Sequence, residues 1–211
     1  MNELKTQDAM ALLKEDHRRI KALFDEFERT EAPGARIEVV EEAIKALKVH
    51  AAVEEELLYP ALRQGFEEAD VDGVVEEADE EHHVAKLLIA ELELMRGTER
   101  FYAAKFRVLA ENVRHHIKGE EHDLFHKALK TDIDFGALGE LIAERRQRLT
   151  DEGVPPDAEA RMIAKFGLRG ESPSVMALES FHAPRLEKKD TLRSPRRKAR
   201  GWLARITGRL D

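Results

Sequence analysis

The chain contains two copies of a histidine followed four residues later by a glutamate, in His50-Ala-Ala-Val-Glu54 and His116-Ile-Lys-Gly-Glu120. If both stretches are helical, the two side chains of each pair lie on one face, one turn apart. The copies then continue alike, with a glutamate, a leucine and an aromatic residue at matching positions: Glu55, Leu58 and Tyr59 in the first, Glu121, Leu124 and Phe125 in the second. Ordinary surface charge does not repeat in this order. The rest of the sequence is therefore interpreted by asking which part of the fold the two His–Glu pairs face.

Apolar residues recur at spacings of three and four over about 8–29, 35–65, 73–96 and 99–130, which predicts four long helices. Turn signals at Pro33-Gly34 and Gly97 separate them. Apolar residues make up 42% of the chain and charged residues 37%, a mixture typical of helices with charged outer faces. Alternating β-branched and aromatic runs are absent from the sequence. We therefore expect an all-α protein built as an up-down-up-down four-helix bundle.

A chain of 211 residues favours one domain with extensions. We predict that residues 1–150 form the bundle and a short fifth helix, and that residues 151–211 form a C-terminal extension. The extension starts with a short helix after Pro155-Pro156, continues as a linker and ends in a basic amphipathic tail, residues 185–211. This tail has ten Lys and Arg against three Asp and Glu, although the whole chain has a net charge of −8. It suits a protein or membrane-surface contact, or a fold back onto the acidic bundle, better than nucleic acid.

The sequence has no cysteine, which excludes thiolate metal sites, disulfides and thiol catalysis. The polar N-terminus lacks the apolar core of a signal peptide, and apolar runs such as residues 87–90 are too short to span a bilayer. We expect a cytoplasmic protein.

Each predicted long helix places one histidine in its apolar stripe: His17, His50, His82 and His116. Glu54 and Glu120 add carboxylates to two of the stripes. Any one of these histidines is ordinarily a core residue with its hydrogen bonds satisfied. Two buried carboxylates, however, cost several kcal/mol each unless positive charge compensates them, and no lysine or arginine occupies a matching inward position. Two cations would supply that charge, and imidazole with carboxylate suits iron, with manganese and zinc as competitors.

Other titratable residues lie close to these positions. His83 is offset from His82 by about 100° around the helix and is the poorer inward candidate. The fourth helix has a neighbouring histidine face that is either solvated or able to hold a surface zinc ion; it contains His115, His122 and His126. Three glutamates are a charged flank, extra ligands or partners of a histidine N–H: Glu55, Glu56 and Glu121.

These residues resemble the hemerythrin HHE cation-binding family over about residues 8–130. The matching motifs are Glu15-Asp16-His17, the His50–Glu54 pair running into Leu58-Tyr59-Pro60, Glu80-Glu81-His82, and the His116–Glu120 pair. The resemblance implies a non-haem di-iron centre inside the bundle. It implies that His17 and His50 bind one iron and that His82 and His116 bind the other. Glu54 and Glu120 would bridge the two irons together with an oxo or hydroxo group.

The sequence departs from the oxygen-carrying members of that family. They have a second histidine one turn after the third-helix ligand, where this chain has Lys86, and a bridging aspartate where it has Glu120. One iron would then be completed by water, His83 or a glutamate such as Glu81. These departures put reversible oxygen carriage in question.

Three functions follow from this interpretation. The first is a di-iron protein that binds or senses O2, NO or the redox state of iron. The second is a di-iron enzyme that decomposes hydrogen peroxide in a catalase- or peroxidase-like reaction. The third is a structural adaptor bundle whose metal only stabilises the fold. The expected partners are a diatomic or peroxide ligand at the metals, and a protein or membrane surface at residues 185–211.

Overall fold

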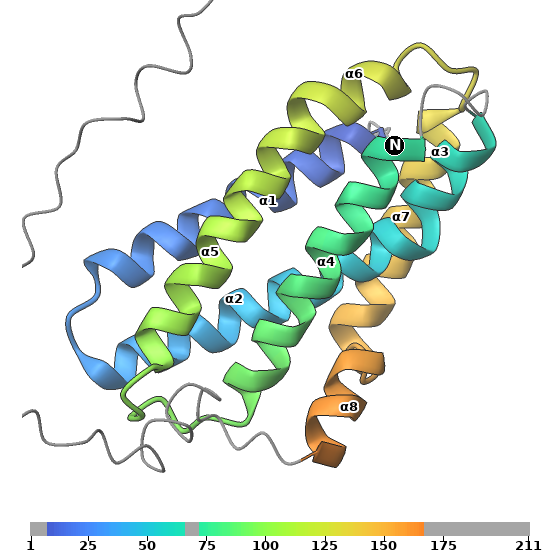
Figure 1. Cartoon of the computed structure of the whole chain (residues 1–211). Coiled ribbons are helices and arrows are strands. Elements are labelled where there is room, and N and C mark those ends of the chain that lie inside the picture. Colours follow the sequence, from blue (N-terminus) through green and yellow to red (C-terminus); the bar gives the residue numbers. More distant parts are fainter. Residues whose placement is uncertain (1–7, 66–71, 167–211) are drawn as a thin grey trace, which may run out of the picture. The chain divides into compact units, whose positions relative to one another are not determined.

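The computed structural model describes residues 8–65 and 72–166, and every regular element in these two ranges is helical (Figure 1). The elements are α1 (Ala9–Arg29), α2 (Pro33–Val53), the π-helical turn η1 (Glu54–Leu58), α3 (Tyr59–Gly65), α4 (Asp72–Glu93), α5 (Tyr102–Gly119), the π-helical turn η2 (Glu120–Leu124), α6 (Phe125–Ala128), α7 (Phe135–Glu152) and α8 (Ala158–Phe166). The prediction of an all-α fold is confirmed for the described residues. The predicted basic tail, residues 185–211, lies outside them.

Local side-chain chemistry sets the helix ends. The Asp8 carboxylate accepts a hydrogen bond from the Ala11 backbone N–H at 2.8 Å and caps α1, and Asp134 caps α7 in the same way. Helix α4 ends at Glu93, earlier than the expected residue 96, and α5 begins at Tyr102 rather than near residue 99. The carboxylate of Glu99 accepts from the backbone N–H of Arg96 at 2.8 Å, which stabilises a turn there. Gly97 and Gly153 adopt φ values of +82° and +85°, which favour glycine.

The second and fourth long helices each contain one π-helical turn. In η1 the backbone N–H of Tyr59 bonds the carbonyl of Glu54, and in η2 the N–H of Phe125 bonds the carbonyl of Glu120. Pro60, which lacks an N–H, follows η1, but the matching position after η2 is occupied by a histidine. Proline is therefore not required for the turn. Single π turns inside α-helices are frequent at functional sites, and both of these turns start at the repeated glutamate.

The helices α1, α2, α4 and α5 run alongside one another (Figure 1). Helix α1 packs against α2 and α4 packs against α5, while α7 covers α1 and α2 and α8 lies on α4. In the part of the chain that the structure describes, no helix is long and apolar enough to cross a bilayer.

Two apolar clusters form the core, and the histidines lie between them along each long helix. One cluster includes Leu13, Val53, Tyr59, Leu62, Phe125 and Ile142. The other includes Ile20, Phe24, Phe27, Leu92, Phe106 and Leu109. Each fully buried side chain of this size stabilises the fold by about 1.5–3 kcal/mol. A polar layer therefore sits in the middle of the core with apolar packing above and below it.

Candidate metal centre

The structure brings together all six residues that the sequence singled out: His17, His50, Glu54, His82, His116 and Glu120. Their side chains come from six different elements, α1, α2, η1, α4, α5 and η2. Each is at most 5% exposed. Among the described residues they are the complete set of histidine and charged side chains buried to this degree. The fold thus gathers its buried polar groups into one place.

The six side chains form two groups that share a carboxylate. His17, His50, Glu54 and Glu120 each offer a ligand atom within 4.8 Å of the others, and so do Glu54, His82 and His116. Oε2 of Glu54 lies 3.2 Å from Nε2 of His50 and 3.4 Å from Nε2 of His82.

Glu120 occupies the corresponding place between the other two histidines. Its Oε2 lies 3.3 Å from Nε2 of His17 and 3.5 Å from Nε2 of His116. Each carboxylate therefore lies between a histidine of one pair and a histidine of the other. His17 and His50 fall in one of the two groups, and His82 and His116 fall in the other.

Six buried donor or acceptor atoms of this cluster have no hydrogen-bond partner. They are Nε2 of His17, both ring nitrogens of His50, both carboxylate oxygens of Glu54 and Oε2 of Glu120. A buried polar atom left unpaired costs about 1–3 kcal/mol, so six together are a large penalty for a folded chain. Metal ions are the partners that imidazole nitrogens and carboxylate oxygens in this arrangement fit.

A ring of outer carboxylates holds three of the four imidazoles. Nδ1 of His17 donates to Glu121, Nδ1 of His82 donates to Glu55 and Nδ1 of His116 donates to Glu81, each at 2.9 Å. These bonds fix the rings so that Nε2 faces the centre, which is how carboxylates orient metal-binding histidines. The sequence left open whether Glu55 and Glu121 form a charged flank, bind metal or accept from a histidine N–H. The structure favours the third role.

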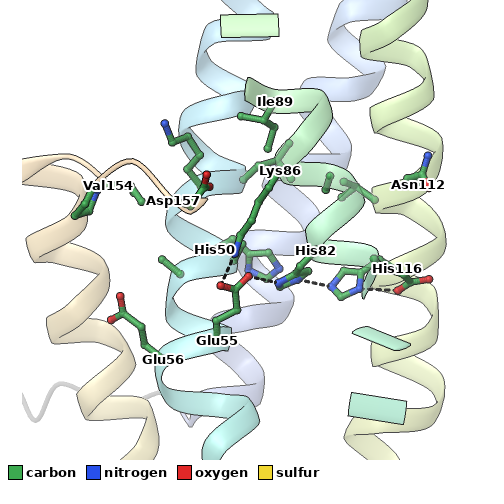
Figure 2. Close-up of a pocket in the computed structure, with 18 residues that line it drawn as sticks. His50, Glu55, Glu56, His82, Lys86, Ile89, Asn112, His116, Val154 and Asp157 are labelled. Atoms are coloured by element: carbon green, nitrogen blue, oxygen red, sulfur yellow. Dashed lines mark hydrogen bonds and ion pairs between the residues drawn. The ribbon is translucent and has the colours of Figure 1, made fainter. Parts of the chain in front are cut away.

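Behind two of these carboxylates lies a lysine, four residues after the histidine on the same helix. Nζ of Lys21 is 3.4 Å from Glu121, and Nζ of Lys86 is 2.5 Å from Glu55. Figure 2 shows Lys86 reaching Glu55, which in turn contacts His82. Lys86 occupies the position at which the oxygen-carrying hemerythrins have a histidine. In this protein it pairs with Glu55 and is not part of either group of possible metal ligands.

The pKa values show how the cluster balances its charge without metal. Burial would lower the pKa of His17, but the adjacent carboxylates of Glu120 and Glu54 raise it to about 10. The pKa of His82 is likewise lowered by burial and raised overall to about 10 by Glu54 and Glu55. Burial lowers the pKa of His50 to about 3. Protons on two histidines therefore compensate the carboxylates, and metal ions have to displace those protons to bind.

Tyr59 joins the site although the sequence did not single it out. Its fully buried hydroxyl donates to Oε1 of Glu120 at 2.9 Å and lies 3.3 Å from Nε2 of His82. Burial and the nearby Glu120 raise the pKa of this phenol well above its usual value. The matching residue of the second repeat, Phe125, instead stacks on His17 with ring centroids 5.9 Å apart. The signal in the sequence that could have identified Tyr59 is that the first repeat has a tyrosine where the second has Phe125.

The remaining candidates lie away from the buried cluster. His83 is about half exposed and contacts Glu159 of α8 at 2.7 Å. Glu56 accepts from Arg145 of α7. The three histidines of the neighbouring face of the fourth helix are at the surface: His115, His122 and His126. None of these residues completes either buried group.

Comparison with known proteins agrees with this geometry. The family model described as hemerythrin HHE cation binding domain matches residues 8–128. The crystal structure of a hemerythrin HHE cation binding domain-containing protein, the Rv2633c homolog from Mycobacterium kansasii, has the same fold, with a TM-score of 0.56 and 22% sequence identity; the match covers 78% of this chain and 99% of that one.

A DNA nickase from Nostoc sp. (strain PCC 7120 / SAG 25.82 / UTEX 2576) is 29% identical over 114 residues. The match covers 54% of this chain but only 31% of that relative's length. The family match spans more than half of the present sequence and includes all six clustered residues. The chain therefore belongs to the hemerythrin HHE cation-binding domain family, with a buried His/Glu cluster able to bind metal.

Proposed function

We propose that this protein holds two iron ions in the buried cluster and uses them to bind or sense O2, NO or the redox state of iron. The observation behind the proposal is the set of six partnerless donor atoms, arranged as two groups that share Glu54. Four imidazoles and two carboxylates suit iron, and elemental analysis separates iron from manganese and zinc. We also propose that α1, α2, α4 and α5 form the up-down-up-down bundle around this pair.

The residues have separate roles in this proposal. His17 and His50 hold one ion, His82 and His116 hold the other, and the two repeated glutamates face both. When bound, the iron pair supplies Lewis acidity and redox chemistry toward a small ligand. Around it, the outer carboxylates keep the rings oriented, and the apolar clusters keep water away.

The test is to load purified protein with iron under anaerobic conditions, count the metal and record optical spectra. We expect two irons per chain and a spectral change when O2 or NO is added to the reduced protein. His116→Ala removes a proposed ligand and should lose iron, whereas His122→Ala changes an exposed histidine that contacts the Lys118 carbonyl and should not. Protein with two irons that responds to neither gas would contradict the proposal.

A second candidate is decomposition of hydrogen peroxide, favoured by the proton donor beside the cluster. Peroxide cleavage needs a proton, and the Tyr59 hydroxyl lies 3.3 Å from Nε2 of His82. Oxygen release from peroxide should exceed that of free iron and be lost in His82→Ala and Glu120→Ala. Activity equal to free iron excludes the enzyme. If metal-free protein also keeps its melting temperature, the structural adaptor becomes the better account.

The relative from Nostoc is named a DNA nickase, and the present chain spans under a third of it. We propose that the buried cluster of this chain does not itself cut DNA. Its six side chains are at most 5% exposed, and a phosphodiester would have to reach the metals. Supercoiled plasmid should stay supercoiled with the iron-loaded protein. The proposal would be refuted if the iron-loaded protein nicked the plasmid and the His116→Ala variant did not.

A further inference from the structure

A cavity of about 190 Å³ opens beside three of the clustered histidines, His50, His82 and His116 (Figure 2). It lies between α2, α4 and α5, and residues 154–157, which connect α7 to α8, form part of its wall. The space therefore reaches the proposed metal centre from the side on which Lys86 and Glu55 lie.

The cavity is much larger than a diatomic ligand requires. A water molecule occupies about 30 Å³ in the liquid, and an apolar cavity of roughly 150 Å³ in another protein holds benzene. A space of about 190 Å³ therefore accommodates an organic body of about six to eight carbon atoms. O2, NO or hydrogen peroxide alone would leave most of it unfilled.

The walls are mostly apolar, with Leu47, Ala85, Ile89, Val113 and Val154 around the space and the imidazoles at one end. Such walls favour an aliphatic or aromatic body, because each buried CH2 contributes about 0.8 kcal/mol. The polar end then belongs at the histidines. A guest of this cavity is thus expected to be amphiphilic, with a single polar head.

The charged residues of the wall already have partners. Lys86 pairs with Glu55 at 2.5 Å and Lys48 pairs with Glu93 at 2.8 Å. The carboxylate of Asp157 accepts from the backbone N–H of Ala160. A charged guest would have to break one of these contacts and leave a partly buried charge unpaired. A hydroxyl group avoids this, because it accepts from the ammonium and donates to the carboxylate of one pair.

We propose that this cavity binds a neutral organic molecule of about six to eight carbon atoms with one hydroxyl-type oxygen. The oxygen lies at the Lys86–Glu55 pair beside the histidines, and the carbon body packs against Ala85 and Val154. The inference deepens the proposed function, since it names a ligand class for the same site. It rests on that function only in placing the oxygen next to the metals.

The binding test uses three probes of one shape on iron-loaded protein, followed by calorimetric titration. Cyclohexanol is the neutral probe, and cyclohexanecarboxylate and cyclohexylammonium are its charged counterparts. We expect one saturable site for cyclohexanol and at least tenfold weaker binding of both charged probes. Absence of cyclohexanol binding, or tighter binding of a charged probe, overturns the inference.

Two variants fill the cavity without touching the proposed ligands. Ala85→Leu narrows it from α4 and Val154→Phe from the α7–α8 connection, so each should weaken cyclohexanol binding at least tenfold and keep two irons per chain. Val84→Leu, at an exposed position beside Ala85, is the matched control and should bind as the parent does. Unchanged binding in both folded cavity variants, shown by their melting temperatures, refutes the site.

The outcomes separate this inference from the proposed function. Protein that responds to O2 or NO but binds no cyclohexanol keeps the function and loses the cavity proposal. Protein that binds cyclohexanol with the expected selectivity but responds to neither gas keeps the cavity proposal and loses the function.

Discussion

The carboxylate of Glu121 lies 2.9 Å from Nδ1 of His17, although 104 residues separate them in the chain. The equivalent glutamate of the first repeat, Glu55, contacts His82 at the same distance. Both follow directly after the glutamate that faces the centre. The repeated Glu-Glu dipeptide therefore has two roles: its first carboxylate points into the cluster, and its second holds a histidine of another helix.

Replacing Glu121 by alanine is expected to lower metal affinity about 10- to 100-fold, because the imidazole of His17 loses the acceptor that orients it. Glu121→Gln keeps an acceptor without charge and should recover part of that loss. Competition with a coloured chelator measures both. Glu56→Gln is the control, since that exposed residue pairs with Arg145 and not with a histidine. Equal affinities in all three variants would show that Glu121 is only a surface charge.

Glu54→Gln is expected to reduce iron from two ions per chain to at most one, because both groups share this carboxylate. In metal-free protein the change also removes the negative charge that faces His17 and His82. Breaking a buried charge pair in this way costs about 3–5 kcal/mol. Elemental analysis tests the first expectation and urea unfolding of metal-free protein tests the second. Full iron content in Glu54→Gln would rule out a shared carboxylate.

Much of this site follows from helical spacing alone. His17 lies in the stripe of Leu13 and Ile20, so an α-helix forces it into the core, and the same argument places His82. Their convergence needs only that the four stripes face one another. The spacing also separated His82 from His83, because a one-residue offset turns the neighbour toward α8.

Other features depend on contacts between distant residues and leave no local pattern. The π turns η1 and η2 begin at Glu54 and Glu120, but the proline that follows η1 has no counterpart after η2, so no shared residue pattern marks the two turns. The histidine partners of Glu55 and Glu121 lie on other helices. Sequence spacing could therefore not decide whether these glutamates are a charged flank, metal ligands or partners of a histidine. The role of Tyr59 depends on how far its ring reaches between α4 and η2. Tertiary packing decides each of these.

Metal-free protein is expected to be most stable near pH 6.5 to 7. The pKa values of His17 and His82 are raised from 6.5 to about 10, so the folded state binds more protons than the unfolded chain between these values. Their contribution is fully present below pH 6.5 and is lost as the pH rises toward 10. The pKa of His50 is lowered to about 3, so stability also falls as the pH drops below 6.5. Urea midpoints from pH 4 to 10 measure both limbs.

Iron should remove the loss of stability at high pH, because the ions take the place of the protons on His17 and His82. The unfolding midpoint of loaded protein is then expected to stay level or rise between pH 7 and 9, while that of metal-free protein falls. Potentiometric titration during loading should record proton release. Identical pH profiles with and without iron would mean that these histidines do not exchange protons for metal.

Helix α7 is expected to unfold together with the metal centre and not as a separate appendage. It packs on α1 and α2, and its Ile142 is fully buried in the same cluster as Leu13 and Tyr59. Ile142→Ala should cost about 2–5 kcal/mol, the usual loss for a large buried aliphatic side chain. Leu141→Ala, at a neighbouring position that is 53% exposed, should change stability by no more than about 0.5 kcal/mol. Urea unfolding followed by circular dichroism and by iron release gives both midpoints. A single shifted transition in Ile142→Ala places α7 in the cooperative unit that holds the cluster, whereas an unshifted iron-release midpoint would show that the cluster folds without it.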